Sequence, residues 1–309
     1  MTATLSEALA KFLKIKRASM RSEATIKWYT SVLSAMSDNI GHTVLVSTVT
    51  DDDLVDYITE LRERDQRYVD EKQKPAQAGG LRHESIRTHI RALKSFWKWC
   101  SKSYGIANPM DAIPMPRRRD PQPKSIDPSD FCKLMDATLD SPAGIRDRAI
   151  LALLADTGVR AGGILSLQVE TIDAVRGRGR VLEKGYKERW VYWSHHTSLL
   201  VQKWMQVRES HTDSFVVNVS TGEPLTYSGL AQMLKRLKKR AKVRGRVNAH
   251  AFRHNFARMY LIGGGDLVTL ARLLGHSDVN VTAAYYAVFA DNELADLQKK
   301  YSPVDRMLD

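Results

Sequence analysis

Apolar residues recur every three or four positions through most of the first hundred residues, which is the spacing of one helix face. This pattern predicts helices at Ser6–Arg17, Ser22–Met36 and Glu84–Cys100, and another from the acidic residues 51–53 to Leu61. Acidic residues suit a helix start because they face the positive end of its dipole. Arg64–Gly80 is polar and ends in Gly-Gly, so a mobile loop is expected there.

The helical pattern stops in a segment rich in proline and arginine. Residues 114–123 contain four prolines and three arginines, and proline cannot continue a helix. We therefore predict a helical domain at 1–110, a linker at 111–125 and a second domain at 126–309. The linker arginines Arg117, Arg118 and Arg119 are either solvated charges or a basic strap that lies along phosphates.

The second domain is predicted to be helical around a small sheet. Residues 169–193 alternate in the manner of strands, with turns at 176–180 and 184–187. Helices are expected on both sides of this segment, and the last of them covers 291–300 as a tail helix. The predicted fold class is mainly α with a small antiparallel β-sheet.

Composition narrows the class of protein. The chain has 309 residues, of which 43% are hydrophobic and 27% charged, and its net charge is +12. These values exclude global disorder, and the excess of basic residues favours an anionic partner such as nucleic acid. The two cysteines, Cys100 and Cys132, form no metal-ligand pattern. The longest apolar run, Ala149–Ala155, is far shorter than the ~20 residues of a spanning helix, so a cytoplasmic protein without membrane contact is expected.

One stretch is strongly basic. Residues 224–265 contain ten Lys and Arg and neither Asp nor Glu. A solvated helix face normally mixes both signs of charge, so a helix that faces DNA is the better interpretation. Its candidate contacts are Lys235, Lys239 and Lys242.

The chain has no phosphate-binding glycine loop, no HExxH and no GxSxG. The residues that remain as candidates for catalysis are basic and aromatic. Each of them alone is weak evidence of an active site. Two arginines can place guanidinium forks on the non-bridging oxygens of a phosphodiester and offset the charge of its transition state. Arg160 and Arg253 suit that role. A tyrosine, with a free pKa of about 10, can act as nucleophile when cationic groups lower its pKa.

In their order and spacing, four motifs resemble the tyrosine recombinase family, which includes phage integrases and Xer-like proteins. The motifs are TGVRAGGILSL (157–167), EKGYKERWVYW (183–193), HAFRHNFA (250–257) and LLGHSDVNVTAAYY (273–286). The resemblance covers the whole second domain. It extends more weakly to 80–100, which is similar to a helix of the family's core-binding domain. It implies a SAM-like core-binding domain at 1–110, a catalytic domain at 126–309 and a C-shaped clamp on DNA.

The resemblance also implies the nucleophile. Tyr285 follows His276 by nine residues, as in the family, and His276 resembles a donor to a phosphate oxygen. Tyr286 is the competing nucleophile. Neighbouring side chains on a helix diverge by about 100°, so only one of the two tyrosines can face the phosphate.

The resemblance further implies the groups that move protons. His250 is similar to the family's acceptor of the phenolic proton. Lys184 matches the lysine that protonates the leaving 5′ oxygen, and Lys187 is the alternative. No metal or other cofactor is implied.

One position departs from the family pattern. An acidic residue usually stands three positions after the first arginine, and here that position is Gly163. The acid supports the site and does not react, so its loss affects positioning more than function. Asp156 or Glu170 is a candidate to replace it.

The predicted function is that of a site-specific DNA recombinase, which works through a covalent 3′-phosphotyrosine and a Holliday junction. A type IB topoisomerase-like enzyme and a catalytically impaired DNA-binding regulator are the alternatives. The resemblance implies duplex DNA with paired inverted half-sites as partner. It also implies a homotetramer on DNA, a monomer or weak oligomer in its absence, and a nucleoid-associated protein of a bacterium, archaeon or phage.

Overall fold

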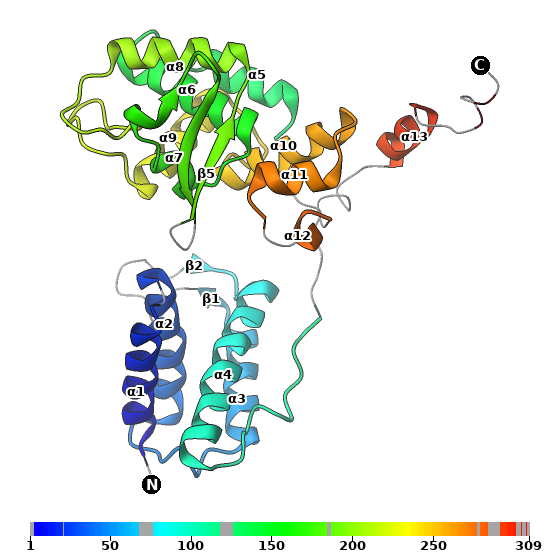
Figure 1. Ribbon diagram of the computed structural model, residues 1–309. Coiled ribbons are helices and arrows are strands. Elements are labelled where there is room, and N and C mark those ends of the chain that lie inside the picture. Colours follow the sequence, from blue (N-terminus) through cyan, green and yellow to red (C-terminus); the bar gives the residue numbers. More distant parts are fainter. Residues whose placement is uncertain are drawn as a thin grey trace. The chain divides into compact units, whose positions relative to one another are not determined.

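The computed structural model divides the chain into two compact units, Met1–Asp120 and Pro121–Asp309 (Figure 1). It describes residues 3–20, 22–67, 77–117, 126–183, 187–276, 279–283 and 291–300, together with residues 304 and 307. Each unit has its own hydrophobic core.

The first unit contains four long helices among its described residues. They are α1 (Leu5–Ala18), α2 (Glu23–Ile40), α3 (Asp51–Glu63) and α4 (His83–Tyr104). Capping boxes begin α1 and α3, where the Thr4 and Thr50 side chains accept hydrogen bonds from the backbone of Glu7 and Asp53. The helices predicted from apolar spacing are confirmed.

Helix α4 shows how that spacing produces the core. The apolar residues that recur every three or four positions along it, among them Ile90, Leu93 and Phe96, are buried. Phe12 of α1 meets the Phe96 ring edge to face, with centroids 5.4 Å apart. The apolar stripe of α4 therefore packs into a core that it shares with α1, α2 and α3.

The segment 64–80 differs from the prediction of a loop. Its ends form two short strands, β1 (Gln66–Arg67) and β2 (Gln77–Ala78), which pair antiparallel. Strand pairing of this length uses backbone groups alone, so a polar sequence without alternation does not reveal it. Residues 68–76 lie outside the described part of the chain.

Part of the predicted linker contacts α4. Arg87 Nε donates to the Pro116 carbonyl over 2.9 Å, and His83 Nε2 lies 2.8 Å from the Arg117 carbonyl. Lys94 Nζ donates to the Met110 carbonyl at 2.7 Å. The described end of this segment is thus held on the first unit.

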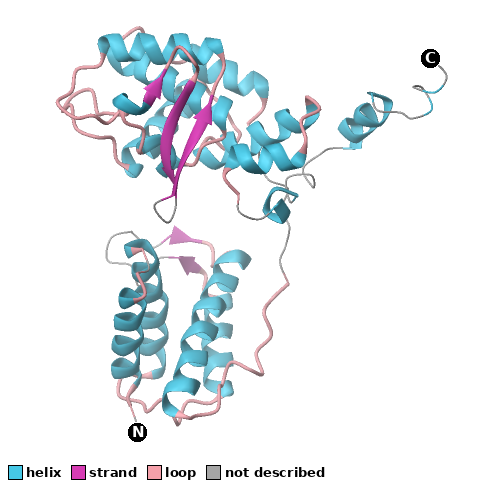
Figure 2. Ribbon diagram, viewed as in Figure 1, coloured by secondary structure: helices cyan, strands magenta, loops and turns pink. Residues whose placement is uncertain are grey.

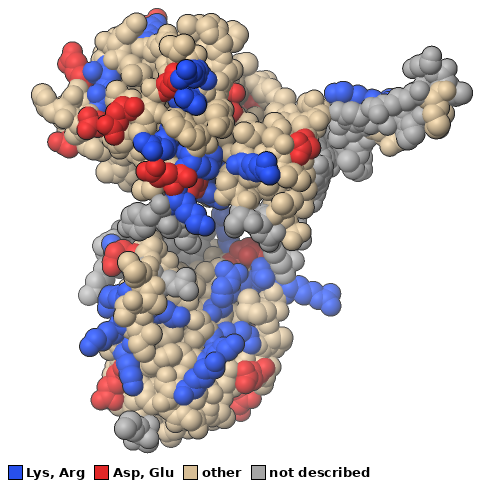
Figure 3. Space-filling model, in the orientation of Figure 1, with Lys and Arg blue, Asp and Glu red and all other residues tan. Residues whose placement is uncertain are grey.

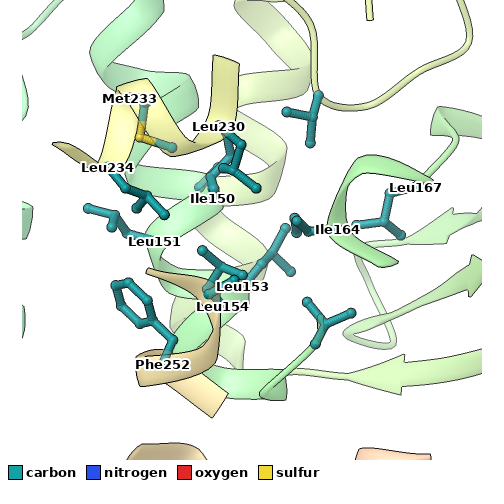
Figure 4. Close-up of a cluster of buried hydrophobic side chains, with 14 of the residues drawn as sticks. Ile150, Leu151, Leu153, Leu154, Ile164, Leu167, Leu230, Met233, Leu234 and Phe252 are labelled. Atoms are coloured by element: carbon teal, nitrogen blue, oxygen red, sulfur yellow. The ribbon is translucent and has the colours of Figure 1, made fainter. Parts of the chain in front are cut away.

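The second unit is built around a helix whose middle is a continuous apolar run. Its long helices are α5 (Pro128–Asp136), α6 (Pro142–Thr157), α8 (His195–Val207), α9 (Tyr227–Arg240), α10 (Ala249–Ile262), α11 (Leu267–Leu274) and α13 (Asp291–Lys300). Shorter ones are α7 (Ala161–Leu165), η1 (Val169–Thr171) and α12 (Val279–Ala283). Figure 4 shows side chains of α6 between those of α7, α9 and α10. A continuous apolar run cannot keep one helix face in water, and residues 149–154 of α6 are all buried. The charged pair Arg146 and Asp147 precedes this run.

A three-stranded antiparallel sheet lies beside these helices (Figure 2). Its strands are β3 (Ile172–Asp173), β4 (Arg178–Glu183) and β5 (Lys187–Tyr192), in that order. Val181 and Val191 face the core, and Glu183 pairs with Lys187 at the end of the β4–β5 ladder. The predicted fold class, mainly α with a small antiparallel sheet, is confirmed. The clamp arrangement of the two units stays a prediction.

Within the described parts of the chain, none of the helices combines the length and the apolar character that crossing a membrane requires.

Candidate functional site

Arg160 projects from a tight turn between α6 and α7. Gly158 ends α6 with φ +56°, and a Cβ there would lie 2.7 Å from Cδ1 of Phe256. Both the left-handed backbone and the close contact require glycine at this position. Arg160 follows as the N-cap residue of α7, with its NH1 hydrogen-bonded to Oε2 of Glu183. The turn thus places a guanidinium beside a carboxylate of the sheet.

Arg253 is held by the ends of two helices. Its side chain is 1% exposed and projects from α10. NH1 donates to the Gly158 carbonyl at 2.8 Å, and NH2 donates to the Leu274 carbonyl at 2.7 Å. These carbonyls lie at the C-terminal ends of α6 and α11, where the helix dipole is negative. The buried guanidinium is therefore stabilised by dipoles and brought close to the Arg160 turn.

His276 follows the glycine that ends α11, and its hydrogen bonds assign its tautomer. Nε2 lies 2.6 Å from Arg253 NH2, and Nδ1 lies 2.7 Å from Oγ1 of Thr282 on α12. A guanidinium can only donate, so Nε2 accepts and the proton sits on Nδ1. His276 is thus a neutral acceptor toward Arg253 in this structure, and a donor role toward phosphate requires that contact to change.

The environment of His276 makes stability depend on pH. Burial and then the charges of Arg253 and Arg160 lower the pKa of His276 from 6.5 to about 4. Between these values the unfolded chain binds a proton that the folded chain does not, so stability falls as pH decreases through this range. We expect the melting temperature to be lower near pH ~5 than near pH ~7.5, and the difference to shrink in His276→Gln. Thermal unfolding at both pH values measures it.

A matched control is His196→Gln on the exposed surface of α8. It should show the same pH dependence as the wild type. An equal dependence in His276→Gln would show that this imidazole does not carry the effect.

His250 lies in the first turn of α10, three residues before Arg253. Partial burial and then the charges of Arg253 and Arg160 lower its pKa. Burial also lowers the pKa of His254 on the same helix. A lowered pKa leaves the His250 imidazole neutral near pH 7, so it is able to accept a proton.

Glu183, which the sequence reasoning did not select, completes the charged cluster. Its carboxylate contacts Arg160 on one side and Arg189 of β5 on the other. Strand alternation is the signal that could have found it, because Val181 two residues earlier faces inward. The structure corrects the earlier candidates for this carboxylate, Asp156 and Glu170.

Each of those two carboxylates lies elsewhere. Asp156 Oδ2 accepts from the Ser194 backbone N at 2.6 Å and from Thr197 Oγ1 at 2.8 Å, and so stabilises the start of α8. Glu170 is exposed in η1.

Several candidate residues lie outside the described part of the chain. They are Lys184, Tyr285, Tyr286, Arg118 and Arg119. Lys187, the alternative to Lys184, is exposed at the start of β5, and Arg117 is exposed as well. Among the described residues, no three His, Cys, Asp or Glu side chains cluster in a way that could hold a metal ion.

The basic stretch presents part of its charge to solvent. Lys235 and Lys239 are exposed four residues apart on α9, and Lys242 is exposed just beyond its end. On the opposite side, Leu230, Met233 and Leu234 are buried in the core. Helix α9 is therefore amphipathic, with an apolar inner face and a basic outer face.

The first unit carries exposed positive charge too. Arg91 and Lys98 are exposed seven residues apart on α4, which places them on one helix face. Figure 3 shows Lys and Arg side chains in several groups on the viewed face of this unit.

Comparison with known proteins identifies one family and its relatives. Residues 124–292 match the model of the phage integrase family. Tyrosine recombinase XerC of Proteus mirabilis is 30% identical over 210 residues, which cover 67% of this chain and 68% of that protein. XerC of Vibrio cholerae serotype O1 (strain ATCC 39541 / Classical Ogawa 395 / O395) is 28% identical over 212 residues, with the same coverage.

Solved structures share the fold. The Tn1549 transposon integrase in complex with transposon right end DNA aligns with a TM-score of 0.74 at 16% identity, over 96% of this chain and 99% of that one. The XerH recombinase bound to palindromic difH aligns with a TM-score of 0.71 at 19% identity, over 96% of this chain and 84% of that one.

Proposed function

Since the chain belongs to the phage integrase family, we propose that it is a site-specific tyrosine recombinase that cuts and rejoins duplex DNA. The observation that carries this function is the gathering of Arg160, Arg253, His250 and His276 around the C-terminal ends of α6 and α11. Two guanidiniums and two neutral imidazoles suit a phosphodiester, which gains negative charge as it is attacked.

In the proposed reaction, the Tyr285 phenolic oxygen attacks phosphorus and forms a 3′-phosphotyrosine bond. The bond from phosphorus to the 5′ oxygen breaks. The phenolic proton passes to His250, and the departing 5′ oxygen takes a proton from Lys184. Attack by a 5′ hydroxyl on the phosphotyrosine reverses these steps and rejoins the strand, so no external energy source is consumed.

The arginines act in the transition state. Arg253 is fixed by two carbonyls before DNA arrives, so its charge needs little reorganisation when the phosphate binds. Arg160 NH1 is engaged by Glu183, and its other nitrogens are assigned to a non-bridging oxygen. When the phosphate is bound, an Arg253 N–H that faces His276 turns to the phosphate. Nε2 of His276 then donates to the phosphate after the ring changes tautomer: Nε2 takes a proton from solvent, Nδ1 releases its own, and Thr282 Oγ1 donates to Nδ1.

The assembly belongs to the same proposal. The DNA substrate carries paired inverted half-sites, each bound by one protomer, and a homotetramer performs strand exchange through a Holliday junction. The free protein is a monomer or weak oligomer, and the enzyme works in association with the nucleoid of its cell. A topoisomerase-like enzyme and an impaired regulator are not favoured, because the relatives named above are tyrosine recombinases.

The function is tested by capturing the covalent intermediate. Purified protein is incubated with fragmented genomic DNA of its source, with EDTA present, and the reaction is stopped with detergent. Sequencing the DNA that stays attached to protein should reveal a recurrent site, which then supplies a nicked suicide substrate and a two-site recombination substrate. Adduct formation at unrelated sequences, with plasmid relaxation and no recombination, would favour a topoisomerase. Adducts that require added magnesium would contradict a metal-free reaction.

The basic face of α9 yields a prediction on salt dependence. Replacing Lys235 and Lys239 with Gln and Lys242 with Asn should weaken binding to all duplexes by similar factors. Each lost phosphate contact should reduce the slope of log affinity against log salt by about 0.9. Asn is chosen at 242 because this residue has φ 53°, a conformation that Asn tolerates. Gel shifts at several salt concentrations measure the slope.

The control for this experiment is Lys203→Gln, an exposed lysine of α8, which should leave the slope unchanged. An unchanged slope in the triple variant would show that the α9 face does not contact DNA.

A further inference from the structure

We propose that Glu183 is the positioning residue for Arg160, an assignment that rests on the proposed role of Arg160 at the scissile phosphate. The Glu183 side chain is 8% exposed and lies between the guanidiniums of Arg160 and Arg189. A carboxylate buried to this degree is stable only with charged or hydrogen-bonding partners. Here each of its two oxygens has an arginine partner.

The two arginines have different surroundings. The Arg160 side chain is 37% exposed and can reach a ligand, whereas that of Arg189 is 15% exposed. Arg189 binds Glu183 Oε1 through Nε at 3.2 Å and NH2 at 3.0 Å, and its NH1 donates to the Leu273 carbonyl at 2.8 Å. Glu183 is therefore anchored through Arg189 to the end of α11, and it presents its other oxygen to Arg160.

Gly163 on α7 lies next to the Glu183 carboxylate. A Cβ at 163 would lie 3.8 Å from Glu183 Oε1 and 2.6 Å from Cγ2 of Val159. The family pattern has an acid at position 163, where this chain has no side chain. The Glu183 carboxylate comes from the sheet and lies close to that position. The negative charge beside Arg160 comes from the end of β4 and not from α7.

The location of Glu183 at the end of β4 determines how the Arg160 guanidinium is oriented. Glu183 is the last residue of β4 and directly precedes Lys184. Its Oε2 fixes one side of Arg160, so the guanidinium is oriented before a phosphate binds. The carboxylate does not touch the phosphate, and its effect on the reaction passes through Arg160.

The test compares Glu183→Gln with Glu188→Gln on the nicked suicide substrate. Glu188 is the matched control because its side chain is 58% exposed and pairs with Arg180. Glu183→Gln should lower the single-turnover rate of adduct formation by about 10²-fold, with DNA affinity close to that of the wild type. Its melting temperature should fall, because two guanidiniums lose a buried carboxylate, but the variant should stay folded at the assay temperature. Glu188→Gln should cleave at the wild-type rate.

A second measurement separates positioning from folding. In Glu183→Gly, formate added to the reaction can enter the vacated space between the guanidiniums and should raise the cleavage rate several-fold, while leaving the wild type unaffected. A second rescue moves the acid from 183 to 163. Both variants compared here carry Val159→Ala, which removes the methyl group that would contact a side chain at 163. In that background, Gly163→Glu/Glu183→Gly should cleave faster than Glu183→Gly.

The outcomes distinguish the two proposals. If the wild type is active and Glu183→Gln cleaves at the same rate, the role of Glu183 is overturned and the proposed function is not. Loss of fold in Glu183→Gln, together with no response of Glu183→Gly to formate, would assign Glu183 a structural role and also overturn it. A wild type that forms no adduct on any DNA would overturn the proposed function, and this assignment with it.

Discussion

Replacing Tyr285 with phenylalanine is expected to abolish the covalent adduct while leaving DNA binding intact. The substitution removes only the phenolic oxygen, which is the atom that forms the bond to phosphorus. The arginines that hold the phosphate are unchanged, so the affinity measured by gel shift should stay within about twofold of the wild type. Adduct formation on a nicked suicide substrate, followed on a denaturing gel, is the decisive measurement.

The neighbouring tyrosine provides the control. Tyr286→Phe should form the adduct at nearly the wild-type rate. An adduct with Tyr285→Phe and none with Tyr286→Phe would assign the nucleophile to Tyr286.

Arg253→Lys is expected to slow cleavage by about 10²-fold to 10³-fold although the positive charge is kept. Lysine has a single nitrogen and cannot span the carbonyls of Gly158 and Leu274 while also contacting His276. Because these contacts join α6 to α11, the variant should also melt at a lower temperature. Single-turnover cleavage and thermal unfolding measure the two effects.

Arg258→Lys on the same helix is the matched control, since Arg258 is only half-buried. It should cleave at close to the wild-type rate. A wild-type rate in Arg253→Lys would show that charge alone is sufficient at this position and that the fork geometry is not needed.

The sequence predicts the elements that depend on local pattern. The apolar stripe of α4 and the continuous apolar run of α6 predict buried helices, and both are buried. The Thr-Gly-Val-Arg turn and the HxxR spacing place Arg160 and Arg253 on elements that the structure brings together. Such features follow from periodicity and from backbone preferences, which act over a few residues.

Features that depend on contacts between distant segments could not be predicted. Glu183 meets Arg160 across 23 positions, and Arg253 meets Leu274 across 21. The tautomer of His276 follows from its contact with Arg253, so the residue type alone does not give it. Strand alternation places Glu183 on the same inward face as Val181, but it does not show that Arg160 and Arg189 meet the carboxylate there.

The location of the carboxylate restricts how such a site can change during evolution. A chain with acids at both 163 and 183 would bring two negative charges into contact, since a Cβ at 163 would already lie 3.8 Å from Glu183 Oε1. A chain with neither acid would leave Arg160 and Arg189 facing one another without compensation. Both single-step intermediates are therefore disfavoured, and the two positions are expected to be strongly epistatic. Homologous proteins should carry an acid at one position or the other, so the charge around the first arginine is maintained in space and not at a fixed place in the alignment.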